Sequence, residues 1–214
     1  MSNKDDENLP DVLPIFPLSG VLLLPRGHLP LNIFEPRYMA MVNAALKTDR
    51  MIGMIQPVEY QADELYKVGC AGRIISFEET DDGRYLITLE GVSRFHVAAE
   101  LESAEGYRRV KVSWDEFKND NVPMKCLDLD KPKLVALLEG YFEQEGLSCS
   151  WDAIEESGDE KLITCLSMIC PFDAKEKQVL LEAGCCKERA QKFMTMLDMA
   201  VQGVLSSELS DTQH

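Results

Sequence analysis

The sequence predicts an α+β protein in which a small β-barrel with one packed helix precedes an α-helical bundle. Up to residue 114, short apolar runs alternate with Pro and Gly, which is typical of brief, strongly bent strands. Beyond residue 128, apolar residues recur at intervals of three and four, which indicates amphipathic helices. Short connections between these helices favour antiparallel packing, and therefore a bundle.

The stretch 13–38 begins the β-structure. Three apolar runs lie in it, separated by residues that cannot extend a strand, and Pro17, Pro25 and Pro30 belong at strand starts, edges or bulges because proline cannot donate to a ladder. A helix is then expected over 35–47, since Pro36 suits the first helical position. Its apolar stripe should pack on the barrel and comprises Tyr38, Met41, Val42, Ala45 and Leu46.

Short strands follow this helix. Asp82-Gly83 predicts a hairpin turn, because glycine adopts positive φ without steric cost. Gly91 is interpreted as a second turn between two strands. The expected strands are 51–56, 68–77, 84–90, 93–101 and 109–114, which with the opening stretch gives seven or eight. Strands this short and this dense favour a closed or partly closed barrel.

Five helices are predicted after the barrel. Asp130 starts the first, Ser150 caps a short second, and Asp159 opens a third whose stripe includes Ile169. Asp173 and Glu176 resemble a capping box, and the longest helix covers 187–205. The expected organisation is a disordered N-terminus at 1–8, the barrel at 9–118, a linker at 119–127, the bundle at 128–206 and a disordered tail at 207–214.

Charge and composition exclude several functions. The formal net charge of −15 argues against a nucleic-acid interface and against anionic membranes. No apolar run approaches the roughly 20 residues that span a bilayer. The seven cysteines are an odd number without zinc spacing, so we expect reduced thiols, no metal site and a cytoplasmic location. The vicinal pair Cys185-Cys186 could be a redox or metal site, but we favour two residues of a helix–helix turn, one buried and one not, since buried free cysteine usually acts as a small hydrophobe.

Several motifs, in this order, resemble the N-terminal domain of the ATP-dependent Lon protease. They are L-P-I-F-P-L, L-P-L-N-I-F-E-P-R-Y, I-G-M, V-G-C-A-G-R-I, D-G-R-Y-L-I-T-L-E-G-V-S-R-F and, in the helical part, P-F-D-A-K-E-K-Q-V-L-L-E. The resemblance covers residues 9–205 and implies a PUA-like barrel followed by a helical subdomain. Lon continues into an ATPase and a Ser/Lys peptidase, whereas this sequence contains no G-x-x-x-x-G-K-[ST] motif.

The resemblance therefore implies a stand-alone Lon substrate-binding-domain protein without catalytic residues or cofactors. Its implied partners are unfolded or damaged polypeptides and a protease or chaperone, and the expected state is a monomer or weak homodimer. An apolar groove at the junction of barrel and bundle is the expected binding surface. The candidate peptide-binding residues are Phe34, Arg37, Met39, Arg84, Tyr85, Met196 and Met199.

Structural interpretations of these residues stay open beside the functional one. Arg37 and Glu35 could clamp a ligand, or Glu35 could interact with the helix dipole while Arg37 ties the helix to a barrel strand. Arg84 with Tyr85 could line a groove or form a cross-strand ladder with Arg94 and Phe95. The methionines could adapt to varied apolar partners or fill the core. A small-ligand or nucleic-acid-binding protein of PUA-like fold is the alternative function, and an enzyme is a third hypothesis that lacks a nucleophile–base pair.

Overall fold

The computed structural model describes residues 9–59, 63–102, 105–122, 129–148 and 150–211. The described strands are β1 (Val12–Pro17), β2 (His28–Ile33), β3 (Met51–Ile55), β4 (Val68–Glu79), β5 (Tyr85–Leu101) and β6 (Arg108–Ser113). The described helices are α1 (Pro36–Leu46), the 3-10 helix η2 (Asp115–Asn121), α2 (Lys131–Glu145), α3 (Trp151–Glu156), α4 (Asp159–Ile169), α5 (Ala174–Leu181) and α6 (Cys186–Asp211). The α+β class predicted from the sequence is confirmed.

The strands form one sheet that returns on itself. Their order is β2-β5-β4-β3-β1-β6, and β6 also pairs with β5, so the strands β5-β4-β3-β1-β6 close a ring. The pair β1–β3 is parallel and the other pairs are antiparallel. In the described ranges the sheet has six strands, fewer than the seven or eight expected.

One long, bent strand accounts for part of this difference. The turn expected at Gly91 is wrong, because β5 runs through this position without interruption. At this point β5 has one residue more than its partner strand β4. Gly91 pairs with Gly72 and Ser93 pairs with Ala71, so Val92 forms a β-bulge between them. A bulge of this kind bends a strand, so the first half of β5 can pair with β2 and its second half with β6.

The opening stretch holds two strands instead of three apolar strand segments. Leu22, Leu23 and Leu24 are buried but lie outside any strand. Their segment instead crosses β5, where Arg26 N donates to Gly91 O at 2.7 Å and Gly91 N donates to Gly27 O at 2.8 Å. The run is therefore apolar because it is buried under the helices, and not because it belongs to a strand of the sheet.

The interior of the ring and the apolar stripe of α1 form the core of the strand-containing part of the protein. The ring encloses Leu13, Ile15, Met51, Ile55, Leu65, Ala71, Phe95, Val110 and Val112. On α1 the buried residues are Tyr38, Met41, Val42 and Ala45, as the sequence predicts, while Leu46 is only partly buried.

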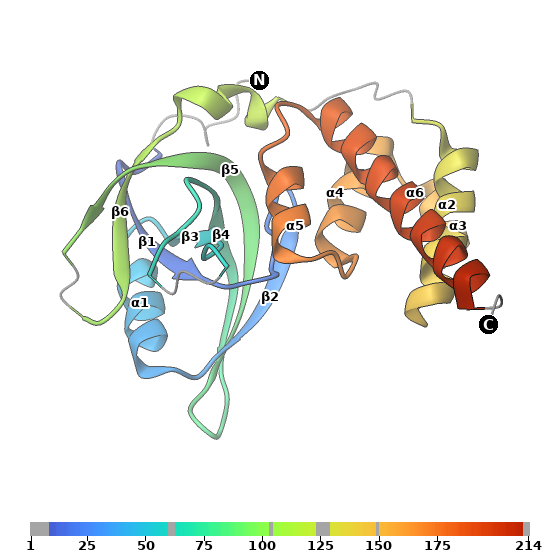
Figure 1. The fold of residues 1–214 in the computed structure, drawn as a ribbon. Helices are drawn as coiled ribbons and strands as arrows, with labels where there is room; N and C mark the ends of the chain where they lie inside the picture. Colours follow the sequence, from blue (N-terminus) through green and yellow to red (C-terminus); the bar gives the residue numbers. More distant parts are fainter. Residues whose placement is uncertain (1–8, 60–62, 103–104, 123–128, 149, 212–214) are drawn as a thin grey trace.

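Helices α2 to α6 gather on one side of the sheet, away from α1 (Figure 1). Asp130 caps α2 by accepting from Lys133 N, and the capping box of Asp173 and Glu176 on α5 is confirmed. α6 continues to Asp211, beyond the predicted end at 205. Residues 1–8, expected to be disordered, lie outside the described ranges. No described helix has both the length and the apolar character that crossing a bilayer requires.

Candidate functional site

Buried polar contacts attach the helices to the strand ring. Gln56 at the end of β3 is 1% exposed. Its Nε2 donates to Ala174 O at 2.9 Å and to Gln178 Oε1 at 3.2 Å, while its Oε1 accepts from Gly20 N. Lys177 Nζ donates to Gly20 O at 2.8 Å, and burial lowers the pKa of this ammonium group. Because these partners are far apart in sequence, they fix α5 against the ring.

Arg94 forms several buried contacts across this junction. Its Nε and Nη2 bind both carboxylate oxygens of Asp120, at 2.9 Å and 2.7 Å, and the two side chains are 3% and 8% exposed. Its Nη1 donates to the carbonyls of Leu181 and Ala183 at the end of α5. The guanidinium also lies over the Phe117 ring, 4.3 Å from its centroid. One side chain thus joins β5, η2 and α5.

A cleft of about 400 Å³ opens at this junction, between the segment 26–28 and α4. Its lining residues are Arg26, Gly27, His28, Glu160, Lys161, Thr164, Cys165, Met168 and Ile169. Ligand sites in proteins commonly enclose about 300–1,000 Å³ and are mostly apolar with a few polar groups. The cleft has a volume within this range and lies where the strand ring meets the helices.

The apolar part of the cleft comes from α4. Met168 packs against Gly27 so closely that a Cβ on this glycine would lie 2.3 Å from the methionine sulfur. Ile169 at the C-terminal end of α4 is 67% exposed, unusually high for a large apolar side chain beside a hollow. The sequence pattern placed Ile169 on the packed stripe, and this prediction is wrong because the helix ends at this residue.

Charged groups surround this apolar surface. Arg26 pairs with Glu160 across the cleft, and Arg26 Nη1 also donates to Asp120 O. On the strand side, His28 Nε2 lies 3.6 Å from a carboxylate oxygen of Glu90. The cleft is therefore an apolar surface with a polar rim, the arrangement that protein-binding surfaces favour.

None of the seven residues predicted from the sequence lines this cleft. Phe34 is 62% exposed after β2, and Arg37 pairs with Glu35 at 2.8 Å and lies 4.5 Å from the centroid of the Tyr38 ring. Met39 is half-buried against the core. Arg37 therefore fastens the start of α1 locally, and among the described residues no hydrogen bond or ion pair joins its side chain to a strand, contrary to the structural interpretation from the sequence.

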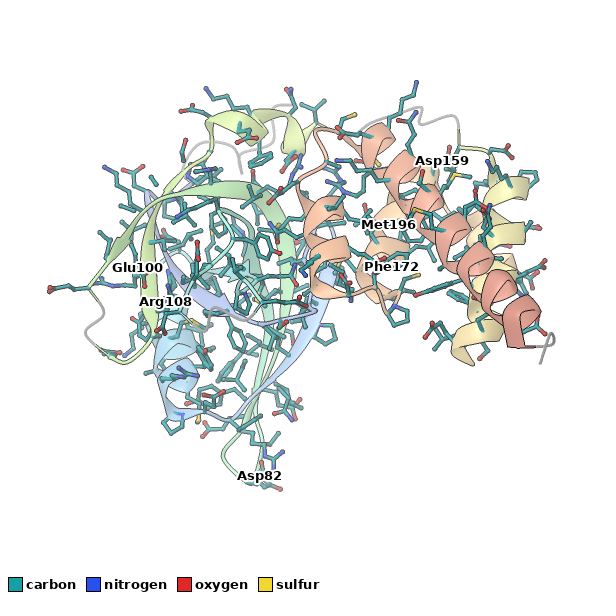
Figure 2. The ribbon with its side chains drawn as sticks, in the orientation of Figure 1. Asp82, Glu100, Arg108, Asp159, Phe172 and Met196 are labelled. Carbon is teal, nitrogen blue, oxygen red and sulfur yellow. The ribbon has the colours of Figure 1, made fainter. Side chains whose placement is uncertain are left out.

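The predicted residues of the hairpin and of α6 lie far apart. Arg84 pairs with Asp82 at 3.0 Å, and Figure 2 shows Asp82 at the tip of the β4–β5 hairpin and Met196 among the helices. Tyr85 is buried, its ring centroid is 5.0 Å from that of Phe77, and its hydroxyl accepts from Asn43 Nδ2.

On α6, Met196 is half-buried and Met199 is 69% exposed. The ladder expected between Arg84–Tyr85 and Arg94–Phe95 is wrong, because all four residues lie on or next to one strand, β5.

The described part of the chain holds no group of three or more His, Cys, Asp or Glu side chains that could bind a metal ion. Of the vicinal pair, Cys185 is exposed and Cys186 is buried, as interpreted from the sequence. Burial raises the pKa of the Cys186 thiol.

Two solved structures share this fold. One is described as a Lon N-terminal domain protein from Xanthomonas campestris, with a TM-score of 0.60 and 22% identity over 86% of this chain and 97% of that one. The other is the N-terminal domain of a Lon protease from the Mycobacterium avium complex, with a TM-score of 0.62 and 18% identity over 89% of this chain and 98% of that one. The architecture is therefore that of Lon N-terminal domains.

The chain belongs to the family described as the ATP-dependent protease La (LON) substrate-binding domain, whose model matches residues 12–199. Among curated relatives, Lon protease 2 of Myxococcus xanthus is 25% identical over 99% of this chain, and a Lon protease of Cytophaga hutchinsonii is 27% identical over 94%. The chain spans only 27% and 26% of the length of these relatives. The match covers the substrate-binding domain and not the ATPase or peptidase regions.

Proposed function

We propose that this protein binds extended apolar segments of unfolded or damaged polypeptides in the cleft between segment 26–28 and α4. The single observation that carries the proposal is a 400 Å³ apolar cleft at the junction of ring and helices in a chain of the Lon substrate-binding family. On one side of the cleft, the backbone of Arg26 and Gly27 is hydrogen-bonded to Gly91 of β5, which fixes this segment before a ligand binds and favours affinity.

The proposed activity is recognition without hydrolysis, with delivery of the bound chain to a protease or chaperone. The support is that the family match is confined to the substrate-binding region. An unfolded model protein incubated with the purified chain, with or without ATP, should remain full-length on a denaturing gel. Fragments whose appearance requires the chain would contradict this part of the proposal.

A pair of matched substitutions tests the location of binding. Ile169→Asp places a carboxylate on the cleft, and Met199→Asp places one on a predicted residue of α6 with nearly the same exposure, 67% against 69%. Ile169→Asp should weaken binding of a reduced, alkylated model protein about tenfold or more, because an apolar contact would then bury a charge. Met199→Asp should leave the Kd unchanged, as fluorescence anisotropy would show.

The reverse result, loss of binding with Met199→Asp alone, would refute the cleft and support the residues predicted from the sequence. Equal weakening by both variants would also refute it, since added negative charge would then explain the effect. Both positions are exposed, so neither substitution should disturb folding, and circular dichroism verifies this.

A further inference from the structure

A second, smaller hollow lies beside the cleft, where η2, α4 and the start of α6 come together. It encloses about 80 Å³ and shares Arg26, Glu160 and Thr164 with the cleft. Arg94, Asp120 and Arg189 also contribute to its lining. A hollow of this size accommodates a few water molecules or one small ion.

Arg189 is the charged residue lining this hollow that has no ion-pair partner among the described residues. Its side chain is buried, with the residue 5% exposed, and its Nε donates to Leu180 O at 2.9 Å. Within the described ranges its two Nη groups have no hydrogen-bond partner and no carboxylate at ion-pair distance. Among the described residues, Ser167 Oγ is the only side-chain N or O atom that is both fully enclosed and without a hydrogen-bond partner. The Nη groups of Arg189 are therefore not fully enclosed, and since Arg189 lines the hollow, they open onto it.

The other charges around the hollow cancel in pairs. Asp120 neutralises Arg94, and Glu160 neutralises Arg26. Burial, and next the positive charge of Arg94, lower the pKa of the Arg189 guanidinium. Among the described residues that line it, the hollow thus has one more positive than negative side chain, in a chain whose net charge is −15.

The start of α6 adds a second favourable element. Cys185 and Cys186 line the hollow at the N-terminal end of this helix, where backbone N–H groups and the helix dipole favour anions. A guanidinium with two free Nη groups presents a planar fork that matches the two oxygens of a carboxylate or phosphate.

We propose that this hollow is a subsite for one small oxyanion, supplied by a carboxylate of the polypeptide that occupies the adjacent cleft. The proposal that a bound polypeptide supplies the oxyanion rests on the proposed function. The proposal that the hollow binds a free oxyanion does not depend on it. The cleft and the hollow together would then bind apolar polypeptide segments that carry an acidic side chain next to the apolar residues.

The first test uses the unmodified chain and free anions. Inorganic phosphate and acetate are titrated separately at constant ionic strength while NMR follows the backbone amides of Gly184–Cys186 and the Nε–H of Arg189. Saturable shifts with a Kd on the order of 1 mM are expected for a single site of this kind. Shifts that stay linear and small over this range would overturn the subsite.

Matched variants assign the effect to Arg189. Arg189→Gln should weaken phosphate binding about tenfold or more, since hydrogen bonds to a charged donor are stronger than those between neutral groups. Lys192→Gln removes the same charge from the same helix but from a residue that pairs with Glu188 and does not line the hollow. Equal weakening by both variants would refute the subsite. If Arg189→Gln does not fold, the titration of the unmodified chain decides alone.

A peptide series identifies the source of the oxyanion. Apolar peptides with one Asp at successive positions are each compared with their Asn counterparts. One Asp position should bind about tenfold more tightly than Asn, and Arg189→Gln should abolish this preference. If phosphate binds but no Asp peptide is preferred, a free ion is the ligand and the carboxylate assignment fails. If phosphate binds and no peptide binds at all, the proposed function fails and the subsite stands.

Discussion

Replacing Arg94 with methionine is expected to lower the free energy of unfolding by about 3–5 kcal/mol, because it leaves a buried carboxylate unpaired. Asp120 is 8% exposed and depends on Arg94 for its ion pair. The substitution also leaves the Leu181 and Ala183 carbonyls without this donor. Urea denaturation followed by circular dichroism measures the loss.

Arg84→Met is the matched control on the same sheet. Arg84 and its partner Asp82 are 52% and 59% exposed, so removing this pair should not measurably change stability. If the two variants lost equal stability, Arg94 would not be the link between the ring and the helices. The double variant Arg94→Met/Asp120→Leu should recover much of the loss, since no unpaired charge would remain.

Gly91→Ala is expected to lower stability by about 1–3 kcal/mol or more, since the site has no room for a methyl group. A Cβ at this position would lie 2.0 Å from Leu24 O, which is backbone and cannot rotate away. The segment that must move continues into Arg26 and Gly27, which line the cleft. We therefore expect Gly91→Ala to weaken binding of unfolded polypeptide as well, which thermal unfolding and anisotropy measure together.

Gly140→Ala on α2 provides the comparison for this effect. Its Cβ would meet Val201 at 3.4 Å, an ordinary contact, and alanine favours a helix over glycine by up to about 1 kcal/mol. Stability should therefore stay the same or rise. A Gly91→Ala protein as stable as Gly140→Ala would show that the crossing of segment 24–27 over β5 is not tightly constrained.

Local signals explain what the sequence predicted correctly. The start of α1 at Pro36 and the capping box of Asp173 and Glu176 depend on residues within one helical turn, and both are present. The turn predicted at Gly91 is wrong because glycine is equally typical of a turn and of a bulge or close backbone approach. Only its proximity to Leu24 O, 67 residues earlier in the chain, distinguishes the two.

The sequence does not predict which residues meet where the strand ring contacts the helices. Arg94 and Asp120 are separated by 26 residues, and Gln56 and Gln178 by 122, so no local periodicity pairs them. Ile169 matched the apolar stripe of α4, yet its exposure depends on where the helix ends. The sequence motifs that carry the family resemblance instead highlighted Phe34, Arg37 and Tyr85, whose positions outside the cleft follow only from the tertiary structure.

NMR can locate the surface of the protein that contacts an unfolded polypeptide. Backbone amide shifts of the isotope-labelled protein, recorded while an unfolded, alkylated model protein is added, report every contact surface at once. We predict that the perturbed amides fall in segment 24–28 and in α4, and that they saturate with the Kd from anisotropy. Perturbation confined to the surroundings of Phe34, Arg84 or Met199, with segment 24–28 and α4 unchanged, would show that polypeptides do not bind in the cleft.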